Sequence, residues 1–65
     1  MKYKVYLQYW HENSIGEQSE GPCLLQGTFE TETEAEALAN KLREENPRHD
    51  IGSGGEAGAW VTIEG

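Results

Sequence analysis

Hydrophobic and polar residues alternate strictly along residues 2–10 of the chain. The odd positions hold Tyr3, Val5, Leu7 and Tyr9, and the even positions hold Lys2, Lys4, Tyr6, Gln8 and Trp10. A period of two with many aromatic and β-branched side chains is typical of a β-strand. The pattern therefore predicts a strand whose two faces carry different sets of side chains.

Two later segments have the same strand character. Residues 23–30 place Leu25 and Phe29 in phase, with Gly27 between them. Residues 59–64 alternate again, with Ala59, Val61 and Ile63 on one side and Trp60, Thr62 and Glu64 on the other. We therefore expect three strands in total.

The helix signal between the second and third strands is the strongest in the chain. Thr31 is a suitable N-cap and Glu34 follows three residues later, as in a capping box. An apolar stripe at helical spacing follows, made of Ala35, Leu38, Ala39 and Leu42. Asn46 precedes Pro47, which disfavours helical backbone at Asn46, so the helix is expected to end there.

Polar or glycine-rich segments connect these elements. Residues 11–22 predict a long polar connection, and residues 47–58 predict a flexible return segment. Gly52–Gly55 lacks the Lys-Ser/Thr that a phosphate-binding loop requires, so a hinge or slack linker is the better interpretation.

Side-chain chemistry indicates how the strands pair. An antiparallel register with Lys4 opposite Glu30, and another with Lys2 opposite Glu64, both pair opposite charges and keep apolar residues together. The prediction is one α+β domain over residues 1–65, with order ββαβ, a three-stranded antiparallel sheet in strand order 2-1-3, and the helix on one face. The helix is expected to cover Val5, Leu7, Leu25, Phe29, Val61 and Ile63.

This topology leaves the opposite face of the sheet without a cover. Its expected aromatic and apolar residues are Tyr6, Trp10, Leu24 and Trp60. Trp and Tyr are frequent in binding hot spots, so this face is a candidate protein-binding surface. Alternatively, the loops fold back over the rings, or Tyr6 and Trp60 form only a cross-strand pair. A homodimer through this face would also bury it.

The charge of the chain limits the classes of partner. Five Lys and Arg against twelve Asp and Glu give a net charge of -7, which opposes direct binding of nucleic acid. An acidic rim is expected at Glu30, Glu32, Glu34 and Glu36. It is either a solvated face that complements the helix dipole, or the docking surface of a nucleic-acid mimic, as in phage inhibitors of restriction or CRISPR enzymes.

The stretch from Gly27 to Ala37 resembles the strand-to-helix junction of the small arm-type DNA-binding domains of phage integrases. The resemblance covers about a sixth of the chain and implies architecture only. Those domains carry basic residues where this chain carries Glu.

Catalytic and metal-binding signals are sparse. His11-Glu12 and His49-Asp50 lack the spacing of a zinc site, and Cys23, the single cysteine, has no neighbouring base. A metal- or thiol-dependent enzyme built on these residues is the alternative from another class. We expect a non-catalytic interaction protein, an inhibitor or regulator, without cofactor or bound metal. No signal peptide, membrane span or disulfide is expected, which favours a cytoplasmic location.

Overall fold

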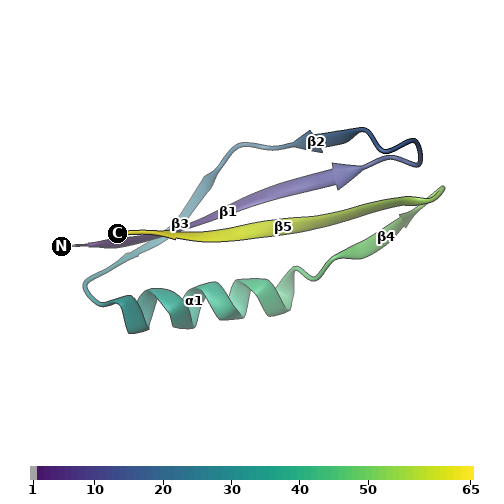
Figure 1. Ribbon diagram of the computed structural model, residues 1–65. Helices are drawn as coiled ribbons and strands as arrows, with labels where there is room; N and C mark the ends of the chain where they lie inside the picture. Colours follow the sequence, from purple (N-terminus) through teal and green to yellow (C-terminus); the bar gives the residue numbers. More distant parts are fainter. Residues whose placement is uncertain (1) are drawn as a thin grey trace.

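In the computed structural model, which describes residues 2–65, an antiparallel sheet of five strands carries one helix on one face (Figure 1). The elements in chain order are β1 (Tyr3–Glu12), β2 (Gln18–Glu20), β3 (Leu24–Phe29), α1 (Glu32–Glu45), β4 (His49–Gly52) and β5 (Gly55–Glu64). The predicted α+β class and the single helix are confirmed for this part of the chain. The predicted three-stranded sheet is wrong, because β2 and β4 lie in segments expected to be loops.

The two ten-residue strands, β1 and β5, form the centre of the sheet. They pair antiparallel from Lys4–Glu64 to Glu12–Glu56. The outer edge of β1 pairs first with β3 and then, further along, with β2. On the other side, β4 pairs with the first residues of β5. The order is thus β2-β1-β5-β4, with β3 also beside β1.

A tight turn after β1 explains β2, the first of the two strands that the sequence analysis missed. The Asn13 side-chain oxygen accepts hydrogen bonds from the backbone N–H groups of Ile15 and Glu17, at 3.1 and 2.9 Å. Gly16 adopts a positive φ of 85°, which a residue without Cβ tolerates. This turn folds β2 back onto the end of β1, so the expected polar connection becomes a short hairpin.

The glycine-rich segment forms a second hairpin. Gly52, Ser53 and Gly54 have consecutive positive φ angles of 88°, 53° and 78°. Such left-handed backbone reverses the chain tightly between antiparallel strands. The segment expected to be a slack linker is therefore the turn between β4 and β5.

The strand registers differ from the predicted ones by two residues. Lys4 lies opposite Glu64 and opposite Thr28, not opposite Glu30. Lys2 instead forms an ion pair with Glu30, at 3.5 Å. Because side chains alternate with a period of two, a shift of two leaves the side chains of β1 and β5 on their predicted faces. The predicted assignment of the β1 and β5 residues to two faces is therefore confirmed.

A β-bulge in β3 changes the faces of two leucines. Val5 lies opposite Gly27 but Tyr6 lies opposite Leu25, so Gln26 is an extra residue between them. An extra residue reverses the alternation beyond it. Leu25 therefore shares the face of Tyr6 and is 55% exposed, which makes its predicted place in the core wrong.

The core lies between α1 and the odd-numbered residues of β1 and β5. Its buried residues are Val5, Leu7, Ala35, Ala39, Leu42 and Val61, and Tyr3, Phe29, Leu38, Ala59 and Ile63 pack around them. The predicted helical stripe thus reaches the sheet, with Leu38 only half-buried. In the described residues no helix combines the length and apolar character that a membrane crossing needs.

The termini of α1 follow the prediction. Thr31 is the N-cap, and its hydroxyl oxygen accepts a hydrogen bond from the Glu34 backbone N–H at 3.3 Å. At the other end Asn46 donates to the Leu42 carbonyl through both its backbone N–H and its side chain, at 3.0 and 2.9 Å. These bonds satisfy groups that a helix leaves unpaired at its ends.

The helix covers only part of the sheet. Its 14 residues span about 21 Å, whereas a ten-residue strand spans about 33 Å. In Figure 1, α1 lies along one half of β1 and β5, and β2 and β4 flank the other half. We call these the proximal half, which α1 covers, and the distal half, which ends at the two hairpins.

Candidate functional site

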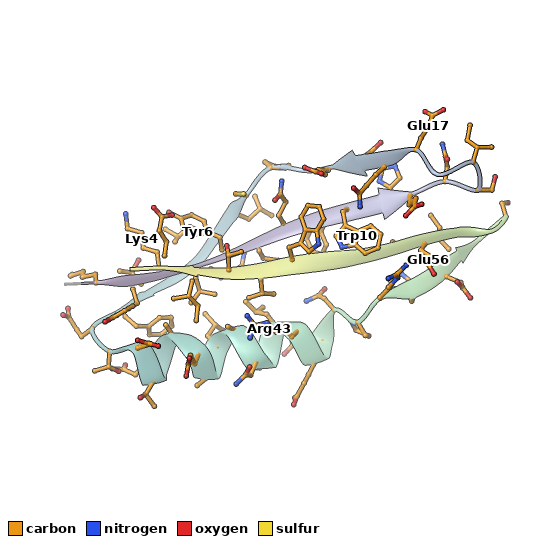
Figure 2. All side chains as sticks on the ribbon, viewed as in Figure 1. Lys4, Tyr6, Trp10, Glu17, Arg43 and Glu56 are labelled. Carbon is orange, nitrogen blue, oxygen red and sulfur yellow. The ribbon has the colours of Figure 1, made fainter. Side chains whose placement is uncertain are left out.

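The even-numbered residues of β1 and β5 form a face that points away from α1, which we call the open face. Cross-strand pairing places them together: Tyr6 opposite Thr62, Gln8 opposite Trp60, and Trp10 opposite Gly58. Figure 2 shows Lys4 and Tyr6 directed away from the helix. In residues 2–65 no helix lies on this face, where Trp60 and Thr62 are exposed.

Trp10 and Trp60 stack on each other on the open face. Their ring centroids are 6.1 Å apart and the ring planes differ by 25°. The two residues are diagonal neighbours on β1 and β5, a spacing that large aromatic side chains can bridge. Trp60 remains 39% exposed and Trp10 is half-buried. The stacked pair therefore presents one broad, rigid apolar surface.

Gly58 makes room for the Trp10 ring. A Cβ atom at this position would lie 2.9 Å from Cζ2 and 3.1 Å from Nε1 of Trp10. Real Cβ atoms do not approach other atoms so closely, so any larger residue would displace the ring. The missing side chain thus lets Trp10 lie against the backbone of β5.

Arg48 extends the stack on the distal half. The central carbon of its guanidinium lies 5.8 Å from the Trp10 ring centroid, within cation–π range. Its Nε donates to the Glu56 carboxylate at 2.8 Å, and its Nη2 pairs with the same oxygen. The hydrogen bond to Glu56, and then the charge of Glu56, raise the pKa of Arg48, so this guanidinium stays charged. We call Trp60, Trp10 and Arg48 the stacked row.

The structure corrects two expectations about this face. Leu24 lies opposite Leu7, on the α1 side, so its predicted place on the open face is wrong. The bulge at Gln26 is the cause, and it brings Leu25 to the open face beside Tyr6. Tyr6 does not pair with Trp60, because it lies opposite Thr62 and the tryptophans stack on each other instead.

The four glutamates of the expected acidic rim do not form one surface. All are exposed, but Glu30 pairs with Lys2, and Glu34 accepts a hydrogen bond from the Thr31 hydroxyl at 2.9 Å. Glu32 and Glu36 are four residues apart on α1 and therefore share one flank of the helix. Of the four predicted rim residues, only Glu32 and Glu36 are adjacent, exposed and free of the contacts described above for Glu30 and Glu34.

Of the candidate enzyme residues, the two histidines lie near each other but Cys23 is remote from them. Cys23 is exposed between β2 and β3, along one edge of the sheet, whereas His49 is in β4 at the other edge. His11 and His49 both lie opposite Ala57, on the α1 side. In the described part of the chain, no group of three or more His, Cys, Asp or Glu side chains is placed to hold a metal ion.

A cavity of about 330 Å³ opens where α1 ends above the distal half of the sheet. Its lining residues are Tyr9, Trp10, His11, Glu45, Asn46, Pro47, His49, Ala57 and Gly58. The Nδ1 atom of His49 lies 3.0 Å from the Pro47 carbonyl oxygen, so a contact within the segment already engages one ring nitrogen. The cavity forms because the helix is shorter than the strands beneath it.

Sequence reasoning missed one residue of the stacked row, Arg48, and one residue that makes room for the Trp10 ring, Gly58. Arg48 had one weak signal, since it is one of five basic residues in an acidic chain. Gly58 had none, because its role depends on a ring from another strand.

No protein-family model matches the chain, and no curated protein and no solved structure is similar enough to it to count as a match.

Proposed function

We propose that this chain is a non-catalytic interaction module, an inhibitor or regulator, which binds a protein partner through the open face. The observation that carries the proposal is the stacked Trp10–Trp60 pair, which exposes a rigid apolar surface on a sheet face without a helix. A fold of this size gains stability by burying such rings, so leaving them accessible favours a role in binding.

The composition of the face supports a protein partner. Trp60 is the exposed anchor, Leu25 and Tyr6 add apolar area, and Gln8 and Thr62 supply hydrogen-bonding groups. An aromatic centre with a polar surround is the usual anatomy of a protein–protein interface. In this proposal Leu25 takes the place that the sequence analysis gave to Leu24.

A nucleic-acid mimic is the second candidate. It is supported by the net charge of -7 and by the adjacent, exposed carboxylates of Glu32 and Glu36. Only part of the expected rim carries this idea, because Glu30 and Glu34 are engaged with neighbouring residues. The two candidates differ in salt dependence: a mimic loses affinity steeply with added salt, whereas an aromatic interface does so weakly.

The test compares three baits: the unmodified chain, Trp60→Ala and Tyr9→Ala. Tyr9 is the matched control because it is also an exposed aromatic residue of the sheet, 49% exposed, but on the α1 side. We expect the unmodified chain and Tyr9→Ala to capture the same proteins, and Trp60→Ala to lose them. Titration calorimetry with the purified partner should then show a loss of about 2 kcal/mol or more for Trp60→Ala.

Equal capture by all three baits contradicts binding through the open face. Circular dichroism and thermal unfolding of each bait establish that Trp60→Ala is folded. Repeating the titration at high salt separates the candidates, since an affinity that collapses with salt and ignores Trp60→Ala favours the mimic.

A further inference from the structure

The two sides of β5 are paired unequally. On one side β1 pairs with it from Glu56 to Glu64, and on the other β4 pairs only with its start, Gly55 to Ala57. Among residues 2–65, no strand lies beside β5 from Ala59 to Glu64 on that second side. We call this stretch the free edge.

The backbone groups of alternate residues point outwards along the free edge. The Tyr9 carbonyl accepts a hydrogen bond from the Gly21 N–H at 2.8 Å, so it points away from β5. Tyr9 lies opposite Ala59, and opposite residues in an antiparallel pair either bond each other or both point away. The N–H and C=O groups of Ala59 therefore point outwards, and by alternation so do those of Val61 and Ile63.

Arg43 confirms this direction. Its guanidinium donates to the Val61 carbonyl at 3.2 Å and to the Asn40 side chain at 3.1 Å. Figure 2 shows it between α1 and β5. One outward carbonyl is thus occupied by a flexible side chain that a new strand can displace.

A proline explains why β4 does not extend along the free edge. His49 lies opposite Ala57, so extending β4 backwards would bring Pro47 beside Ala59. Proline has no N–H to donate, and it directs the backbone towards the end of α1 instead. Pro47 therefore prevents β4 from extending further along β5, although β5 itself continues as a strand to Glu64.

Two glutamates of α1 lie on the same flank as Arg43, beside the free edge. Arg43 marks the flank of α1 that faces β5, and Glu36 and Glu32 precede it by 7 and 11 residues. Both separations return to the same flank of a helix with 3.6 residues per turn. Two exposed carboxylates thus border an edge that carries unpaired backbone donors and acceptors.

In the distal half, one basic side chain already packs on an aromatic ring of this sheet. Arg48 immediately precedes β4, and its guanidinium packs on Trp10 and pairs with Glu56. Trp60 belongs to the free edge, and its ring is 39% exposed. In the described residues no neighbouring strand supplies it with a contact like that of Arg48. A strand added there would repeat on Trp60 the contact that Arg48 makes with Trp10.

We propose that the free edge binds an extended, basic segment of the partner protein, which adds to the sheet as a strand beside β5. Its backbone pairs with Ala59, Val61 and Ile63, and its Lys or Arg side chains reach Trp60, Glu32 and Glu36. This inference rests on the proposed function, since it names the chemistry of the partner. A second copy of this chain is disfavoured as the occupant, because each copy carries a net charge of -7.

The test is amide hydrogen exchange followed by NMR, on the unmodified chain with a synthetic peptide of Lys, Arg, Val and Thr. The peptide carries basic residues at both odd and even positions, so that they face Trp60 on one side of the sheet and Glu32 and Glu36 on the other. In the free chain the amides of Ala59, Val61 and Ile63 should exchange fast, and those of Trp60 and Thr62 slowly, because the latter bond to β1. The basic peptide should slow exchange at the three outward amides and leave the inward amides unchanged.

Two control peptides and two variants sharpen the result. A peptide with Glu in place of Lys and Arg, and a basic peptide with N-methylated backbone, should protect nothing. Ala59→Pro removes an outward N–H and should weaken the basic peptide about tenfold, whereas Ala59→Val keeps that N–H and should not. Because the exchange pattern is read on the unmodified chain, a poorly folded variant does not decide the question.

Several results would overturn the inference. Shifts of the Trp10 and Trp60 indole signals without amide protection would leave the open-face proposal standing and remove strand addition. Equal protection by the acidic peptide would contradict the charge argument. Protection that rises with protein concentration alone would assign the free edge to a second copy, and no effect of the basic peptide would reject the edge as its site.

Discussion

At the scale of single residues, the open face depends on a fit between one glycine and one ring. The alternation of side chains alone predicted that Trp10 and Trp60 share a face, because a period of two fixes the side of every residue in β1 and β5. It did not predict that the rings stack, since this requires Gly58 opposite Trp10. The sequence contains the glycine but not the contact.

Gly58→Ala should therefore destabilise the fold and disturb the stacked row. The new methyl group would have to displace the Trp10 ring, at a cost of about 1–3 kcal/mol in unfolding free energy. Urea unfolding measures the loss, and near-ultraviolet circular dichroism reports the changed packing of the tryptophans.

Gly21→Ala is the matched control, because its Cβ would meet the nearest atom, the Tyr9 carbonyl oxygen, at an ordinary 3.5 Å. Similar unfolding curves for the two variants would show that the ring does not press on Gly58.

At the scale of elements, the sequence predicted those features that depend on the residues of one segment alone. The helix was predicted from its own caps and stripe, and α1 has the expected bounds. The hairpins at Asn13–Glu17 and Gly52–Gly54 were missed because polar and glycine-rich stretches fit both a loop and a turn. The bulge at Gln26 had no signal in β3 alone, since it exists only relative to β1.

Thr31→Ala should lower stability by about 1 kcal/mol, because it removes the side-chain oxygen that accepts from the Glu34 N–H. For a domain of this size the melting temperature should fall by about 4–8 °C. Thermal unfolding followed by circular dichroism measures the change.

Thr33→Ala is the control at an exposed position inside the same turn, where alanine is the better helix former. It should leave the melting temperature unchanged or raise it slightly. An equal loss in both variants would contradict a specific role for the cap.

At the scale of the whole molecule, the chain is elongated. Its extents are 43 × 19 × 12 Å and its radius of gyration is 13.6 Å, against about 11 Å for a compact chain of this length. The cause is the distal half, where strands extend beyond the helix. Sequence reasoning did not predict this shape because it ended the first strand early and started the last one late.

The distal half should open before the proximal half. Its side chains have no helix over them, so fewer apolar contacts oppose local unfolding there. Hydrogen exchange measured by mass spectrometry should show faster exchange for β4 and the adjoining parts of β1 and β5 than for α1 and the proximal strands. Uniform exchange along β1 and β5 would show instead that the sheet unfolds as one unit.

The pairing of β1 with both β3 and β2 has a consequence for assembly. β3 and β2 occupy successive parts of its outer border, and between them Gln8 and Tyr9 bond to Gly21. A filament of stacked sheets needs two accessible borders on every subunit, one for each neighbour. In residues 2–65 the outer sides of β2, β3 and β4 are also unpaired, so a strand bound at β5 still leaves other borders at which a further chain could add.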